Sequence, residues 1–145
     1  MLYMQNCSAE ALICTSQATT GTATAYVDML GYDEVKIVAL LNSAGATSSN
    51  PGVLKLSESA DTYYSNSTNI TGMVGDATDG FTIAAADTAN PQVAEFNVDC
   101  RARNRYLFVA IGPAGATQIV GAVAVKSRAE SSTAAAAVAD MSVSG

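Results

Sequence analysis

The stretch DEVKIVALLN, residues 33–42, alternates apolar and polar side chains with a period of two, which is typical of a half-buried β-strand. Lys36 falls on one face of this strand, and four apolar side chains fall on the other. The four apolar residues are Val35, Ile37, Ala39 and Leu41. The segment is therefore predicted to be a strand with one face in a hydrophobic core.

Further β segments flank this strand and are separated by clusters of Gly, Asn, Asp, Ser and Pro. They are predicted at residues 11–16, 22–30, 53–59, 81–85, 91–99, 105–113 and 117–128. The segments 105–113 and 117–128 are apolar on both faces, as expected of covered central strands, and Gly121 predicts a bulge or a close approach of two backbones. The segment 91–99 alternates irregularly, which predicts a bulge there. Residues 60–80 are predicted to form a long polar loop.

Short strands with turn signals about every ten residues predict one all-β domain over residues 1–130, an antiparallel β-sandwich or jelly roll. Residues 131–145 are rich in Ala and Ser and are predicted to form a C-terminal arm. This arm is expected to be flexible or to form a short helix, because Ala has the highest helix propensity. No stretch reaches the roughly 18 uncharged apolar residues of a transmembrane helix, so we expect no membrane partner.

The composition argues against several classes of function. Seven basic and thirteen acidic residues give a net charge of −6, and nucleic-acid affinity depends on many basic residues, so we expect no nucleic-acid partner. The chain has no His, the commonest general base and metal ligand, so we expect no enzyme activity, metal or cofactor. Charged residues make up only 14% of the chain, against about 25% in a typical soluble domain. Such a weakly charged surface suits a protein that packs against neighbours.

Two further sets of residues favour structural interpretations. The acidic residues of GDATDGFTIAAAD, residues 75–87, lack the spacing and the closing Glu of a calcium loop, so a polar turn is predicted there. The three cysteines include no CxxC pair. They are predicted to be free, mostly buried thiols, and one disulfide with a leftover thiol is the alternative.

The segment CRARNR, residues 100–105, concentrates three of the seven basic residues of the chain: Arg101, Arg103 and Arg105. It lies between two predicted strands, so it is predicted to be the corner of a hairpin. One interpretation is a solvated turn whose arginines pair with Asp99 or with other carboxylates. The other is a contact with another subunit or protein, because the planar guanidinium makes two parallel bonds to a carboxylate.

Tyr63 and Tyr64 lie together inside the predicted polar loop. A rigid aromatic pair is well suited to a protein interface, and local packing is an equally good interpretation. With the three arginines, these two residues are the candidate contact residues of the chain. The other tyrosines are predicted to pack in the core or at strand edges.

Four segments, taken in order, resemble small virion proteins that are encoded beside the major capsid gene of tailed phages and prophages. The matching residues are Val27, Asp28, Leu30, Gly31, Tyr32 and Asp33; Leu54, Lys55, Glu58 and Ser59; Val98, Asp99, Arg101, Arg103, Arg105, Tyr106 and Leu107; and Ser127 to Glu130. No single motif is specific, and the resemblance lies in their order. It covers about residues 11–130 and leaves the C-terminal arm outside it.

The resemblance implies a β-sandwich that decorates, or cements, a phage capsid. The implied partners are the major capsid protein and other copies of the chain, as a homotrimer or a homodimer. The implied location is the outer capsid surface of the virion, after synthesis in the host cytoplasm. Two alternatives remain open: a neck, tail or head-fibre protein, and a carbohydrate-binding adhesion module.

Overall fold

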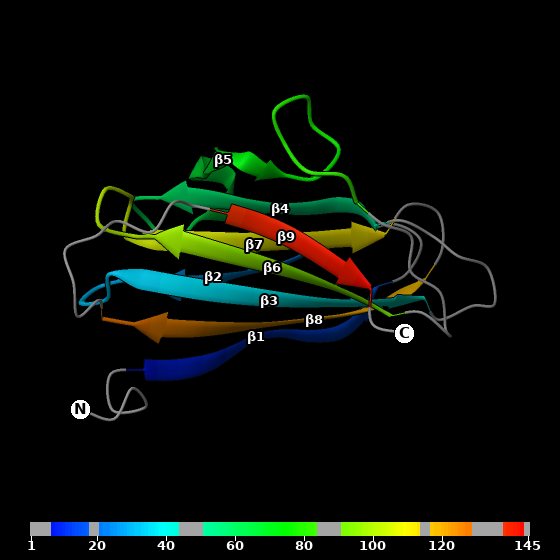
Figure 1. Ribbon diagram of the computed structural model, residues 1–145, viewed down its shortest axis with the longest axis horizontal. Coiled ribbons are helices and arrows are strands. Elements are labelled where there is room, and N and C mark those ends of the chain that lie inside the picture. Colours follow the sequence, from blue (N-terminus) through cyan, green and yellow to red (C-terminus); the bar gives the residue numbers. More distant parts are fainter. Residues whose placement is uncertain are drawn as a thin grey trace.

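The fold consists of two antiparallel β-sheets that enclose one hydrophobic core (Figure 1). A computed structural model describes residues 7–17, 21–43, 51–83, 91–113, 117–128 and 138–143. The predicted antiparallel β-sandwich is confirmed, and the described residues contain essentially no helix beyond the single 3-10 turn η2 (Tyr64–Asn66).

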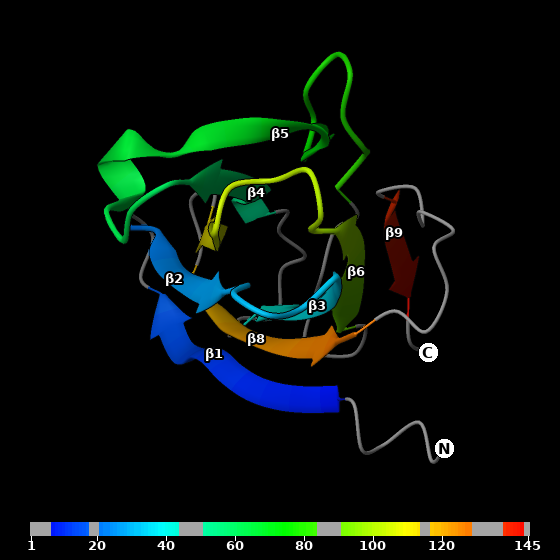
Figure 2. The ribbon, with the colours of Figure 1, turned by 90° about the vertical axis from the view of Figure 1, so that its left-hand side faces the viewer.

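The two sheets contain five and four strands. The five-stranded sheet has the order β1 (Cys7–Gln17), β8 (Gln118–Ser127), β3 (Glu34–Ser43), β6 (Gln92–Asp99) and β9 (Val138–Val143). The four-stranded sheet has the order β2 (Ala23–Asp28), β7 (Tyr106–Pro113), β4 (Pro51–Ser59) and β5 (Thr68–Val74). Figure 2 shows the five-stranded sheet as a curved layer that runs from β1 through β8 and β3 to β6 and β9.

The core is built from alternate residues of both sheets. The four apolar residues predicted to share one face of β3 are all buried, with exposed fractions of 2% or less, so this prediction is confirmed. From the other sheet, Leu56 and Val109 are fully buried in the same cluster. Burying one large apolar side chain stabilises a fold by about 1.5–3 kcal/mol, so this interdigitated layer is the main source of stability.

Of two predicted irregularities, one does not form and the other lies on a partner strand. Burial alternates without interruption along β6, and its pairing with β3 is continuous, so the bulge predicted for residues 91–99 is wrong. The pairing is also continuous through Gly121 of β8 where it faces β3. The bulge falls on the partner strand β1, where the register shifts between Ala11 and Ile13.

Strand β5 replaces part of the predicted polar loop. Its two buried apolar residues, Ile70 and Met73, are three positions apart instead of two or four. The cause is Gly72, whose φ of +82° breaks the alternation of the strand. The strand predicted at 81–85 is wrong over 81–83, where Phe81 forms only an isolated bridge with Gly75, and residues 84 and 85 lie outside the described residues.

Part of the predicted C-terminal arm is a strand. Val138–Val143 form β9, which pairs antiparallel with β6 at the edge of the five-stranded sheet (Figure 2). A short helix over these six residues is therefore wrong, because the backbone bonds to β6 outweigh the weak helix propensity of an Ala-rich segment. Residues 131–137, 144 and 145 lie outside the described residues.

Candidate functional site

The connection that carries the three arginines crosses from one sheet to the other. It joins β6 of the five-stranded sheet to β7 of the four-stranded sheet, so the predicted hairpin corner is wrong. A hairpin requires its two strands to pair, whereas β6 pairs with β3 and β9, and β7 pairs with β2 and β4. We call residues 100–105 the arginine turn.

Arg101 bonds to Asp99, the residue that ends β6 directly before the turn. Its Nε donates to Oδ1 of Asp99 at 3.0 Å and its Nη2 donates to Oδ2 at 2.8 Å. The backbone N–H of Arg101 also donates to Oδ1 of Asp99, at 3.1 Å. These bonds to the ionised form lower the pKa of Asp99 from its ordinary value of 3.8 to about 2. The interpretation that the turn pairs with Asp99 is confirmed.

Arg103 joins the turn to strand β4. Its Nη1 donates to Oε1 of Glu58 at 3.1 Å, and the other oxygen of Glu58 accepts from the backbone N–H of Asn104 at 2.9 Å. Both charged side chains are mostly covered, with exposed fractions of 27% and 19%. One carboxylate therefore neutralises the arginine and caps the backbone of the turn.

Arg105 joins the turn to the end of strand β2. Its Nε and Nη2 donate to the two oxygens of Asp28 at 2.9 and 2.6 Å. The hydrogen bonds from Arg105 lower the pKa of Asp28 to about 2. The guanidinium carbon lies 5.0 Å from the centre of the Tyr106 ring, within the range of a cation–π contact.

Four aromatic rings form a continuous cluster on the outer side of the four-stranded sheet. Leu107 and Val109 of β7 belong to the core cluster, so Phe108 between them points to the opposite face. The ring of Tyr26 from β2 lies 5.6 Å from both Tyr106 and Phe108 between centroids. The fourth ring, from η2, lies 5.8 Å from Phe108. We call Tyr26, Tyr64, Tyr106 and Phe108 the aromatic face.

The two neighbouring tyrosines of the predicted contact site have different surroundings. Tyr64 packs on Phe108 and lies under the ammonium of Lys55, 5.9 Å from its ring centre. Tyr63 is 68% exposed and is one of the most exposed large side chains among the described residues. Local packing is thus correct for Tyr64, and contact with a partner stays a prediction that Tyr63 is placed to fulfil.

The aromatic face and the arginine turn meet at Arg105 and Tyr106, so the structure brings most of the predicted contact residues together. Tyr26 lies on the edge strand β2, in agreement with the predicted packing at a strand edge, but sequence reasoning did not identify it as a candidate contact residue, and it is 43% exposed. The available signal is the alternation within TATAYVDML, where the next residue, Val27, is fully buried. Arg101 and Arg103 bond to carboxylates of the same chain, and their contact with a partner stays a prediction.

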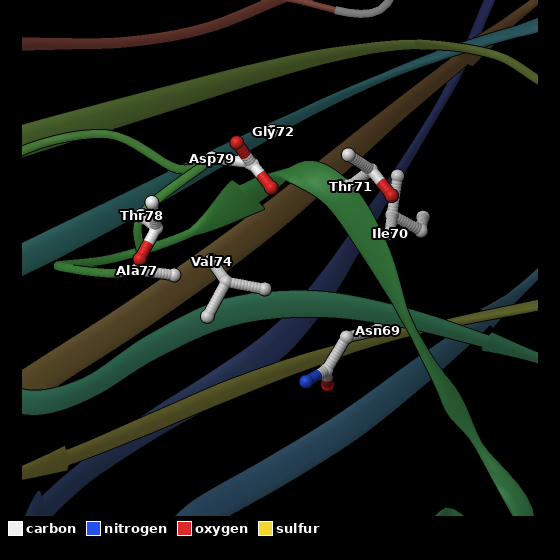
Figure 3. A pocket seen from close by; sticks show the side chains of 8 residues that line it. All are labelled: Asn69, Ile70, Thr71, Gly72, Val74, Ala77, Thr78 and Asp79. Carbon is white, nitrogen blue, oxygen red and sulfur yellow. The ribbon is translucent and has the colours of Figure 1, made fainter.

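A hollow with a volume of about 230 Å³ lies beside strand β5. Thr78 and Asp79 of the following loop contribute polar groups to it, and Figure 3 shows them set apart from Asn69. Asp76, in the same loop, accepts a hydrogen bond from the backbone of Ile83 at 3.0 Å. These groups do not converge on one point, and the predicted polar turn accounts for the described part of GDATDGFTIAAAD.

No group of three or more His, Cys, Asp or Glu side chains in the described ranges is arranged to hold a metal ion. Within the same ranges, no helix has the length and apolar character needed to cross a bilayer. The three cysteines, all of which the structure describes, are thiols that form no disulfide.

No protein-family model matches the chain, and no curated protein matches it in sequence. Distant solved structures share the β-sandwich architecture. One is the Yersinia pseudotuberculosis-derived mitogen, with a TM-score of 0.41, 9% identity and coverage of 92% of this chain and 94% of that chain. Another contains the CBM22-1 and GH10 modules of the Clostridium thermocellum xylanase 10B, crystallised with xylohexaose. Its TM-score is 0.37 at 13% identity, and the match covers 90% of this chain and 28% of that chain.

Proposed function

We propose that this protein is a non-enzymatic structural component of a phage head, a decoration protein that binds the outer surface of the major capsid protein lattice. The observation that supports the proposal most is a convergence in space. Asp28, Glu58 and the arginines come from three of the separate segments that resemble small virion proteins, and they bond to one another at one end of the sandwich.

The fourth segment reaches the same end of the molecule. Nε of Arg128 donates to the carbonyl of Gly31 at 2.8 Å, and the N–H of Asp33 donates to the carbonyl of Ser127 at 3.1 Å. The N–H of Cys100 donates to the carbonyl of Asp33 at 2.8 Å. The four segments that resemble small virion proteins are therefore joined by hydrogen bonds and ion pairs into one unit. This unit holds the arginine turn and the neighbouring aromatic face in place.

The chemistry of this surface suits attachment to protein. Tyr and Arg are enriched among the residues that contribute most to protein interfaces. Tyr combines a large area with few rotatable bonds, and the planar guanidinium of Arg makes several directed hydrogen bonds. Asp28 and Glu58 already neutralise two of the arginines, so a partner that covers this surface meets ion pairs instead of isolated charges. This reduces the cost of removing the charges from water.

Attachment is tested with heads that lack the protein, to which purified variants are added before the heads are sedimented. Tyr63→Ala is expected to weaken binding by about tenfold or more, because Tyr63 is 68% exposed and a partner can cover most of its ring. Ile119→Ala is the control, because this side chain is 51% exposed on the opposite sheet. Equal occupancy by wild type and Tyr63→Ala would contradict a head contact at Tyr63, the neighbour of Tyr64 in the aromatic face.

Charge reversal at Arg103 and Arg105 is expected to weaken attachment at moderate salt. Because each also bonds to a carboxylate of its own chain, the unfolding midpoint of each variant is measured first, and only folded variants are compared. Unchanged occupancy of the heads by these folded variants would count against the assignment.

The number of copies per particle separates a decoration protein, present in many copies, from a neck or tail protein, present as one ring.

The exposed rings of Tyr26 and Tyr63 favour a second candidate, a carbohydrate-binding module. Sugar rings stack on exposed aromatic side chains, and the polar groups of Asp28 and Lys55 lie at the edges of the same face. Titration with a panel of neutral and acidic oligosaccharides, followed by calorimetry, distinguishes the two functions. Saturable heat that is lost in Tyr26→Ala, without binding to heads, would favour the module.

A further inference from the structure

The outer side of the five-stranded sheet is unusually apolar for a surface that faces water. Along β3 and β8, every second residue belongs to the core, so the residues between them point outward. Leu40 is 49% exposed, Ile119 is 51% exposed and Val123 is 37% exposed. On the three central strands β3, β6 and β8, the apolar side chains of this outer face are Val38, Leu40, Val93, Ile119, Val123 and Val125.

These side chains form one stripe because they are cross-strand neighbours. Val38 pairs with Val123 of β8, and Leu40 pairs with Val93 of β6. Contiguous apolar patches of this kind mark interaction surfaces in soluble proteins. Each half-exposed side chain that becomes covered contributes favourable free energy in proportion to its apolar area.

The stripe contains a projection and a hollow side by side. On the other side of Leu40, its neighbour on β8 is Gly121, which has no side chain. An apolar hollow of about 350 Å³ lies there, with Cys14, Val93 and Ile119 among the residues that line it. A two-fold axis between Leu40 and Gly121 places the leucine of each copy over the glycine of the other. The shape of the stripe thus matches a second copy of itself.

The charges of this face also permit a second copy. Away from the strand ends, the charged residues placed on this face are Lys36 and Glu95, which form an ion pair of 2.7 Å, and Asp140 of β9, which pairs with Glu95 in the sheet register. The centre of the face therefore carries one net negative charge from these three residues, whereas the whole chain carries −6. Two identical molecules repel each other least when they approach through their most weakly charged surface.

The whole outer face, with all five strands and their ends covered, is just large enough for a stable pair. Five strands span about 19 Å at the usual spacing, and ten residues extend about 33 Å, which gives roughly 600 Å² per copy. Two copies would then bury about 1,200 Å², the lower end of the range for specific interfaces. We propose that two copies of this chain pack face to face through the outer side of the five-stranded sheet, as a two-fold dimer with Leu40 of each copy in the hollow over Gly121 of the other.

The dimer leaves the aromatic face and the arginine turn uncovered, because they belong to the other sheet and to one end of the sandwich. It therefore goes beyond the proposed function and does not depend on it. Failure of head attachment and failure of dimerisation are separate results, because the first is measured with phage heads and the second with the purified chain alone.

The experiment is sedimentation equilibrium of the purified chain from micromolar to near-millimolar concentration. Wild type is expected to reach twice the monomer mass of 14.8 kDa. Leu40→Glu is expected to weaken the dimer by more than about a hundredfold, because it would bury an uncompensated charge. Leu30→Glu is the matched control, because Leu30 is 67% exposed on the turn after β2 and is expected to leave the dimer unchanged.

Gly121→Val is the second variant and fills the hollow without adding charge. A Cβ at Gly121 meets its nearest neighbour, the carbonyl of Ile13, at an ordinary 3.5 Å, so the monomer is expected to fold. Weakening by both Leu40→Glu and Gly121→Val, with unchanged thermal midpoints for the monomers, supports the proposal. A wild type that stays monomeric, or any oligomer that both variants leave intact, overturns it.

Discussion

The carboxylate of Asp28 accepts hydrogen bonds from two parts of the chain that are far apart in sequence. One oxygen accepts from the N–H of Leu30 at 3.0 Å, which orders the turn between β2 and β3. Both oxygens accept from Arg105, 77 positions further on. An aspartate that sequence reasoning uses only as part of a motif therefore fastens the arginine turn to the end of β2.

This geometry predicts how stability depends on acid. The pKa of folded Asp28 is about 2, below its ordinary 3.8, so its ionised form stabilises the fold above about pH 4. That contribution is lost as pH falls from about 4 to about 2. We expect the free energy of unfolding to fall less steeply over this window in Asp28→Asn than in wild type, as measured by urea unfolding at each pH. Parallel curves for the two proteins would contradict this role of Asp28.

The cysteines differ in their surroundings more than their spacing indicates. All three are thiols, but only Cys100 is buried, so the expectation of mostly buried thiols is wrong. Burial raises the pKa of Cys100 to about 12, because an apolar environment disfavours the thiolate. Cys14 is exposed on the outer side of the five-stranded sheet, where it lines the hollow of the proposed dimer.

Among the elements, β5 shows how one residue hides a strand from sequence analysis. A strand normally buries every second residue, but Gly72 adopts a φ of +82° and moves Met73 into the core out of phase with Ile70. A periodicity search therefore finds no strand there. The polar composition of residues 60–80 adds to the impression of a loop.

The same feature predicts the effect of a substitution. Gly72→Ala is expected to lower the free energy of unfolding by about 1–2 kcal/mol, because a residue with a Cβ is strained at this φ. The space is not limiting, since a Cβ added at this position would lie 3.9 Å from its nearest neighbour, the carbonyl oxygen of Asp79. Thr71→Ala, at an exposed neighbouring position, is the control and is expected to change stability little. Equal urea midpoints for both variants would rule out backbone strain at Gly72.

Strand β9 shows the opposite case, in which tertiary pairing overrides local preference. The Ala-rich sequence before β9 favours a helix weakly. The backbone N–H and C=O groups along the edge of β6, however, pair with β9. An edge strand of this kind is a template for any extended segment that reaches it. The resulting pairing completes the five-stranded sheet and reduces the exposed edge of β6.

At the scale of the whole molecule, the sandwich presents two different surfaces on its two sheets. The four-stranded sheet carries the aromatic face, with ion pairs at its end, and the five-stranded sheet carries an apolar stripe with few charges at its centre. The core between them is common to both. The two proposals, head attachment and self-association, therefore use separate residues.

Separate surfaces predict separate effects of mutation. Leu40→Glu is expected to abolish the dimer but to leave the affinity of each chain for heads within about threefold, and Tyr63→Ala is expected to do the reverse. In the double variant the two changes in free energy are expected to add, because distant sites without shared partners are independent. Both quantities are measured on the same preparations. Loss of head attachment in Leu40→Glu would show that the two surfaces are coupled.

Much of this architecture is predictable because period-two patterns are local. The strands β2, β3, β4, β6, β7 and β8 lie within three residues of their predicted bounds. The pairing of those strands is not predictable in the same way, and the supposed hairpin around the arginines is the clearest example. Nothing between residues 99 and 106 specifies that the chain changes sheet.

The amino-acid sequence alone specifies the class of fold, because alternation of apolar residues depends only on neighbours along the chain. It also concentrates the arginines and tyrosines from which the candidate surface is made. The folded arrangement selects the partners of those side chains: Arg105 meets Asp28 across 77 positions, and Arg103 meets Glu58 across 45. Contacts between residues so far apart in the sequence form when two sheets pack on a shared core. No local sequence pattern encodes which residues this packing brings together.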